Sequence, residues 1–424
     1  MKNRRAIFLL LLANSISGVA QGISMLAIPW YFTGVLHREE LFGKAYFIVT
    51  ALSLFWGLYA GTLVDRFDRK KIFLITNMVG FVILSAVSLY GFIHQQLPWL
   101  LVASIFATTV FVYSIHFPNL YAFAQEITPK EQYSRITSLI EIQGQLTFTI
   151  AGGLAAVLLT GTSHEINLLG FNLVLPFSIN AWKIHEVFAV DAATYLISFL
   201  IIYQIRTLYT ERKTVDKANL FTRIKTGFAF LKAHPALFHF GNASLLLFLT
   251  ILVFGTYIQP IYVVEFLKKG GDVYAFGDMA FSAGALLAGF ITTKLFQEKN
   301  AVRGVIALSI VAGTMYCFMA VNTILLLFFA ADFLIGSCNA AVRIQRITFL
   351  FHHTPNHIIG RTGSVFFVIN VILRLCLIGI LALPFFHAGA NIVYAVAILS
   401  AICFAGAAIL IYYYSRLVEE RAKL

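Results

Sequence analysis

The chain has 424 residues, of which 59% are hydrophobic and 12% are charged, and its formal net charge is +12. A soluble protein carries about a quarter of its residues as charges, so this composition excludes an ordinary soluble protein. The basic residues are spread over many short segments without one basic stripe, so we expect no nucleic-acid binding. The composition favours helices surrounded by lipid.

Twelve apolar segments reach the length of about 20 residues that a membrane-spanning helix needs. Their predicted ranges are 6–30, 44–64, 72–93, 98–122, 136–160, 186–205, 240–264, 273–296, 302–320, 323–345, 360–384 and 392–414. Most of the 31 lysines and arginines precede the first span or lie on every second connection. Because positively charged loops stay in the cytoplasm, this pattern predicts twelve spans in a bacterial-type inner membrane, with both termini cytoplasmic.

The first span contains two polar residues, Asn14 and Gln21, which are seven positions apart and therefore share one helix face. They are candidates for lining a transport path. Polar residues that only bond neighbouring helices together would give the same pattern.

The connection between the second and third spans carries six charges within residues 65–71. A charged loop at the inner end of a span could latch onto the other half of the protein and hold one access state. The residues predicted to act in this way are Gly61, Asp65, Arg66, Arg69 and Lys70. The alternative is that the loop only anchors the topology.

His116 and Glu141 lie toward the inner ends of the fourth and fifth spans, at comparable depth. They could pair or exchange a proton, because histidine titrates near neutral pH. Alternatively, Glu141 is an interfacial residue and His116 bonds a carbonyl group that Pro118 leaves free.

The longest polar segment divides six spans from six. It predicts an N-terminal six-helix bundle at 1–205, a cytoplasmic linker with an interfacial helix at 206–239, and a C-terminal six-helix bundle at 240–424. The halves repeat one another: Thr128-Pro129 with Arg135 and Ser138 recurs as Thr354-Pro355 with Arg361 and Ser364. This repetition favours a duplicated six-span unit. In the linker, an apolar stripe at helical spacing predicts the interfacial helix, formed by Phe221, Ile224, Phe228 and Leu231.

Asp332 and Arg374 lie deep in the tenth and eleventh spans. An ionisable side chain in hydrocarbon costs at least about 2.5 kcal/mol, so each one needs a partner or a function. Their matched depth suggests an ion pair facing a polar cavity, which would serve substrate binding or coupling. A structural clamp between two helices is the alternative.

The 61–71 connection resembles the loop signature of the major facilitator superfamily, G-x-L-x-D-R-x-G-R-[RK]. The matching residues are Gly61, Leu63, Asp65, Arg66, Arg69 and Lys70, and Asp68 stands where glycine is commoner. The Asp68 variant resembles the branch that contains macrolide efflux pumps and enterobactin exporters. The resemblance implies two pseudo-symmetric six-helix bundles, alternating access and a gating role for this loop.

Two departures from the antiporters of this superfamily concern coupling. The fifth span has Phe148 and Thr149 where antiporters often have glycine and proline, and the fourth span has His116 but no arginine.

We expect a monomeric secondary transporter, surrounded by lipid, that exports a small amphipathic molecule with protons as the coupling ion. The alternatives are a siderophore or metabolite exporter, a lipid flippase, and a non-transporting receptor or scaffold. No nucleotide-binding loop of the G-x-x-x-x-G-K-[ST] type and no nucleophile–base constellation is recognisable, so we expect neither a cofactor nor an enzyme. The cluster around His352 and His353 lacks nearby cysteine or carboxylate, so we expect no metal site.

Overall fold

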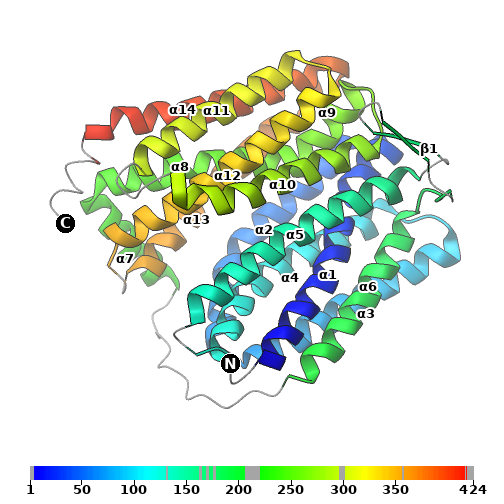
Figure 1. Ribbon diagram of the computed structural model, residues 1–424, viewed down its shortest axis with the longest axis horizontal. Coiled ribbons are helices and arrows are strands. Elements are labelled where there is room, and N and C mark those ends of the chain that lie inside the picture. The colour runs from blue at the N-terminus through cyan, green and yellow to red at the C-terminus, as the bar shows by residue number, and fades with distance from the viewer. Residues whose placement is uncertain are drawn as a thin grey trace. The chain divides into compact units, whose positions relative to one another are not determined.

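The structure is a computed structural model that describes residues 4–129, 132–161, 165–168, 171–174, 178–205, 220–295, 301–355, 358–415 and 417. Long helices make up nearly all of it (Figure 1). By spatial proximity the chain falls into two compact units, Met1–Arg38 with Ala51–Asp216, and Glu39–Thr50 with Lys217–Leu424. We call them unit 1 and unit 2.

Unit 1 contains the first helices of the chain and one short hairpin. Its elements are α1 (Arg4–Trp30), η1 (Tyr31–Val35), the larger part of α2 (Glu39–Arg66), α3 (Arg69–His94), α4 (Trp99–Glu126), α5 (Tyr133–Thr160), β1 (Glu165–Leu168), β2 (Phe171–Val174) and α6 (Ile184–Tyr203). Helix α1 packs on α5 and α6, and α3 packs on α4 and α6. The strands are antiparallel, with Glu165 opposite Val174 and Leu168 opposite Phe171.

Unit 2 contains the remaining helices and the first turns of α2. Its elements are α7 (Leu220–Ala233), α8 (Pro235–Val253), η3 (Phe254–Ile258), α9 (Gln259–Glu265), α10 (Gly271–Leu295), α11 (Ala301–Val321), α12 (Leu325–His353), α13 (Ile359–Leu381), η5 (Pro384–His387), η6 (Gly389–Asn391) and α14 (Ile392–Tyr412). Helix α8 packs on α13 and α14, and α11 packs on α14. These pairings repeat those of α1 with α5 and α6, and of α3 with α6.

The predicted all-α membrane fold with twelve spans is confirmed, because 12 helices among the described residues are long and apolar enough to cross a bilayer. The seventh span begins earlier than predicted, at Pro235. Proline fits there because the first residues of a helix have no intrahelical partner for their N–H groups. The first and seventh spans each contain one π-helical turn in their second halves, η1 and η3.

Helices α10 and α12 pack closely because two glycines face the partner backbone. A Cβ atom built at Gly284 would overlap the carbonyl oxygen of Phe333, and one built at Gly336 would overlap the carbonyl oxygen of Phe281. Small residues let membrane helices approach closely where no hydrophobic force drives their association. The contact holds the tenth span, and with it Asp332, against the eighth.

The linker contains the helix that its apolar periodicity predicts, α7, which packs on α13 and α8. Residues 206–219 of the predicted linker lie outside the described residues. The predicted boundaries of the bundles and the linker remain a prediction.

Candidate functional site

The connection between α2 and α3 is organised by Asp68, the residue that departs from the family signature. Asp68 is the N-cap of α3, with φ −61° and ψ 122°, and its carboxylate Oδ1 accepts the backbone N–H of Lys71 at 2.9 Å. A capping carboxylate satisfies an N–H group that has no partner within the helix, and its charge favours the positive end of the helix dipole. Asp68 therefore fixes where α3 begins.

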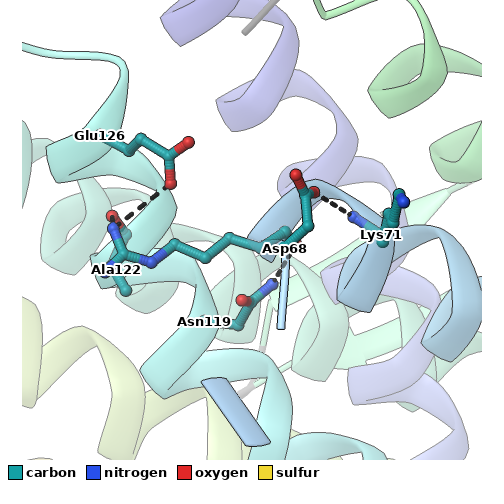
Figure 2. Close-up of polar contacts among 6 residues, drawn as sticks. Asp68, Lys71, Asn119, Ala122 and Glu126 are labelled. Carbon is teal, nitrogen blue, oxygen red and sulfur yellow. Dashed lines mark hydrogen bonds and ion pairs between the residues drawn. The ribbon is translucent and has the colours of Figure 1, made fainter. Parts of the chain in front are cut away.

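Arg69 joins the start of α3 to the end of α4. Figure 2 shows Ala122 and Glu126 at this end of α4, beside Asp68. Its Nη1 donates to the carbonyl oxygen of Ala122 at 2.7 Å and lies 3.4 Å from Oε2 of Glu126. The Asn119 amide returns a bond to the backbone oxygen of Arg69 at 2.9 Å. A cation is stabilised at a helix C-terminus, where carbonyl groups lack partners.

Lys70 makes the corresponding contact with the end of α6. Its Nζ donates to the carbonyl oxygens of Tyr203 at 2.8 Å and Ile205 at 2.7 Å. It also lies 5.5 Å from the centre of the Tyr203 ring. Arg69 and Lys70 thus attach the loop to two other helices of unit 1.

The other predicted gating residues give less information. Gly61 is exposed, and a Cβ atom there would meet nothing within 4 Å. Arg66 is also exposed, whereas the side chain of Asp65 lies outside the described residues. The gating role of this loop remains a prediction.

Three spans of unit 1 are joined by a chain of polar side chains. His116 Nε2 on α4 lies 2.7 Å from Asn14 Oδ1 on α1, and Asn14 Nδ2 donates to Gln143 Oε1 on α5 at 2.8 Å. Because the amide oxygen can only accept, the histidine nitrogen in this contact is the donor. Nε2 of Gln143 is buried and has no hydrogen-bond partner.

A cavity of about 10 Å³ lies beside His116 and Asn14. Its polar lining also includes Ser17, Asn77 and Ser198. This volume is at the lower limit for one water molecule. His116 therefore lies beside a small, mostly apolar cavity that Asn14, Ser17, Asn77 and Ser198 also line.

The structure separates residues that the sequence groups together. Gln21 does not join the Asn14 chain: its Nε2 donates to the Tyr195 hydroxyl on α6 at 3.2 Å. Glu141 accepts the Tyr121 hydroxyl at 2.7 Å, whereas His116 bonds to Asn14. His116 and Glu141 thus have different partners, and within the described part of the chain no direct contact between them supports the predicted proton exchange.

A buried carboxyl group lies between α1 and α6. Asp191 Oδ2 accepts the Ser24 hydroxyl at 2.7 Å, and both residues are fully buried. This contact joins two packed helices, so we assign Asp191 a structural role.

In unit 2, Asp332 is buried and its Oδ2 accepts the Gln259 amide at 2.9 Å. A Cβ atom at Gly277 would lie 2.7 Å from this oxygen and 2.6 Å from Gln259 Nε2, so only glycine leaves room for the contact. Asp278, about two turns from the N-terminal end of α10, lies close enough for its charge to act on Asp332. Three spans thus meet at one carboxyl group.

The predicted ion pair between Asp332 and Arg374 is wrong. Among the described residues no ion pair joins them, and the partner of Asp332 is an amide. The Arg374 charge instead acts on Tyr46, in the first turns of α2, and its buried Nε has no hydrogen-bond partner. Equal depth does not bring two residues together, since it leaves the rotation of each helix undetermined.

Sequence reasoning missed three polar groups of these contacts: Gln143, Gln259 and Asp278. Gln259 and Asp278 stand inside apolar runs, which is the signal that identified Asp332, whereas Gln143 lies between Glu141 and Gln145. Applying the same criterion to amides as well as charges would have found Gln259 and Asp278.

A further polar contact lies outside the spans, on the connection between α13 and α14. His387 Nε2 lies 2.8 Å from the Tyr257 hydroxyl and 3.1 Å from the carbonyl oxygen of Leu381. Burial lowers the pKa of His387 below its ordinary value, opposed by the Leu381 carbonyl and the charge of Glu40. His387 therefore favours its neutral form.

Comparisons with known proteins agree on one family. The family model described as Major Facilitator Superfamily matches residues 10–375. Macrolide efflux protein A of Streptococcus pyogenes is 20% identical over 66% of this chain and 64% of its own length. Multidrug efflux pump Tap of Mycobacterium tuberculosis is 35% identical over 18% of this chain and 19% of its own length. The chain thus spans about two thirds or less of these curated relatives.

Solved structures share the fold at low identity. The nucleoside transporter NupG has a TM-score of 0.67 at 13% identity, covering 96% of this chain and 99% of its own. A bacterial homologue of the iron transporter ferroportin, in an inward-facing state, has a TM-score of 0.69 at 13% identity, covering 96% and 98%. At such identities the likeness concerns the fold alone.

Proposed function

Because the chain belongs to the major facilitator superfamily, we propose that it exports a small amphipathic molecule by alternating access, coupled to the proton gradient. The proposal includes a monomer in a bacterial-type inner membrane with both termini in the cytoplasm. That this is a multi-pass membrane protein of a transporter family is plain from its 12 apolar helices and its family.

The observation that carries the proposal is the buried carboxyl group of Asp332, bonded to Gln259 within the spans of unit 2. An ionised carboxylate is unfavourable in hydrocarbon, and one amide donor does not replace its hydration. A group of this kind binds a proton and releases it when water gains access, as coupling requires. Export is supported by the relatives named for macrolide and multidrug efflux, at 20% and 35% identity.

The test is substrate-dependent proton movement in proteoliposomes that enclose a pH-sensitive dye. We expect a macrolide antibiotic to move protons with the wild-type protein. Asp332→Asn should bind the macrolide but move protons at least tenfold more slowly. Asp272→Asn, which removes an acidic residue from the first turn of α10, is the matched control and should behave as wild type.

Other outcomes would contradict a part of the proposal or favour one of the alternatives. Macrolide binding without proton movement in the wild type would end the coupling part, and unchanged proton movement in Asp332→Asn would end the role of Asp332. Movement of labelled lipid without any macrolide would favour a flippase. Accumulation of a chelator in iron-starved cells that lack the gene would favour siderophore export, and variants without any phenotype would favour a scaffold.

A further inference from the structure

Helix α7 directly precedes the seventh span along the chain. Only His234 separates its last residue, Ala233, from Pro235, where the seventh span begins. A helix joined to a span by one residue has its C-terminal end held close to the bilayer surface. Whatever covers its free face must be found at that surface.

One face of α7 is fixed to unit 2. Leu231 is fully buried, and a Cβ atom at Gly227 would overlap the backbone oxygen of Arg361 in the first turn of α13. Leu231 therefore does not belong to a lipid-facing stripe, as its spacing suggested. It packs α7 against the protein.

Another side of α7 carries a mixed stripe of aromatic and basic side chains. The exposed fraction is 74% for Phe221 and 50% for Phe228, and Lys225 and Lys232 are also exposed. The spacing of four, three and four residues places all four on one side of the helix. We call Phe221, Lys225, Phe228 and Lys232 the α7 stripe.

We propose that the α7 stripe binds anionic phospholipid headgroups of the leaflet in which α8 begins. An exposed aromatic ring is favourable at the boundary between headgroups and acyl chains, where Phe221 and Phe228 would insert. The ammonium groups of Lys225 and Lys232 then lie beside the phosphates, and each is worth about 1 kcal/mol at an anionic surface. Anionic lipid would hold α7, and through Gly227 the start of α13, in the position seen here.

The experiment is thermal unfolding of the purified full chain in detergent micelles that contain either dioleoylphosphatidylglycerol or dioleoylphosphatidylcholine at equal mole fraction. A lipid that binds only the folded protein raises its Tm. We expect the anionic lipid to raise Tm more than the zwitterionic lipid. Added NaCl should reduce this difference, since salt screens exposed charges.

Lys225→Gln with Lys232→Gln should weaken the anionic lipid effect, by about fivefold in apparent affinity for each lysine. Lys268→Gln with Lys269→Gln removes the same charge from the exposed segment after α9 and should keep the wild-type difference. Phe221→Ala with Phe228→Ala should reduce the Tm increase from both lipids.

Three results would overturn the proposal. The first is an equal Tm increase from both lipids in the wild type, and the second is an undiminished effect of the anionic lipid in the variant Lys225→Gln with Lys232→Gln. The third is an equal weakening of the anionic lipid effect in the control variant, which would indicate a general effect of net charge. The measurements use no transported molecule, so failure of the proposed function would leave them unaffected.

Discussion

Asp68 caps α3 through its carboxylate, although glycine is commoner at this position of the family signature. Replacing an N-cap aspartate by alanine costs about 1 kcal/mol, whereas glycine costs only a few tenths, because glycine leaves the amide groups open to water. We therefore expect Asp68→Ala to lower the Tm in detergent by a few degrees and Asp68→Gly to lower it less.

Asp68→Asn provides the control, since asparagine caps about as well as aspartate. A Tm for Asp68→Asn as low as that of Asp68→Ala would show that the charge, and not the cap, matters here.

The burial of His387 predicts that the local stability of the connection between α13 and α14 depends on pH. Burial lowers its folded-state pKa below 6.5, so below pH 6.5 the opened state takes up a proton before the folded state does. The stabilisation from His387 is complete above pH 6.5 and is lost as the pH falls toward the folded-state pKa. Glu39 and Glu40 near Tyr257, and Lys44, exposed on the same helix, are the other titratable groups on this side of α2.

We expect the protection factors of amides in 381–391, which compare the measured exchange rate with the intrinsic rate at each pH, to fall more between pH 7.5 and 5.5 in the wild type than in His387→Gln. An equal fall in both proteins would contradict this account.

The sequence identified the candidate site residues more reliably than it identified their contacts. Asn14, His116 and Asp332 stand out because polar groups in apolar runs need partners. Their partners Gln143 and Gln259 did not follow, because spans that are apolar on every face do not indicate which side meets which neighbour. The predicted ion pair between Asp332 and Arg374 is wrong for the same reason.

At the scale of elements, α10 and α12 pack closely because glycines at their contact carry no side chain. A methyl group at Gly336 has no space beside the carbonyl oxygen of Phe281, so the helices would have to move apart. Overpacking of this kind costs about 1–3 kcal/mol. We expect Gly336→Ala to lower the Tm by several degrees and to weaken coupling, because Asp332 moves with α12.

Gly363→Ala is the matched control in α13, where a Cβ atom meets nothing within 4 Å. It should leave the Tm unchanged or raise it, since alanine favours helix over glycine by about 1 kcal/mol. An equal loss of Tm in both variants would mean that the loss does not arise from close packing at Gly336.

Helix existence followed from apolar length, and all twelve predicted spans are present. Boundaries were less predictable. Span seven starts at Pro235, before the apolar run becomes continuous, and the β1–β2 hairpin lies where the sequence shows only apolar residues interrupted by glycine, asparagine and proline. Short strands depend on pairing, which one segment does not specify.

For the whole molecule, the pattern of basic residues predicts that the connection between the two units is cytoplasmic. A reporter that is active only outside the cell should be inactive when inserted in 206–219 and active when inserted between β1 and β2. Activity at the first position, or inactivity at the second, would invert or break the twelve-span topology.

The duplicated organisation is visible within each unit taken separately. The sequence echoes indicated a repeat, and the recurring helix pairings and the π-helical turns of the first and seventh spans agree with it. π-helical turns often mark functional positions. Each unit has a buried carboxyl group, Asp191 in unit 1 and Asp332 in unit 2, and unit 1 also has the chain of amides and a histidine around Asn14.

The loop anchors of unit 1 have one consequence for mutagenesis. Arg69 and Lys70 bond to backbone oxygens of Ala122, Tyr203 and Ile205, and every amino acid supplies such an oxygen. The helix ends that receive them can therefore drift in evolution without losing the attachment, and an alanine scan across those ends would overlook it. Replacing single amides by esters, which weakens the carbonyl as an acceptor, would expose the attachment instead.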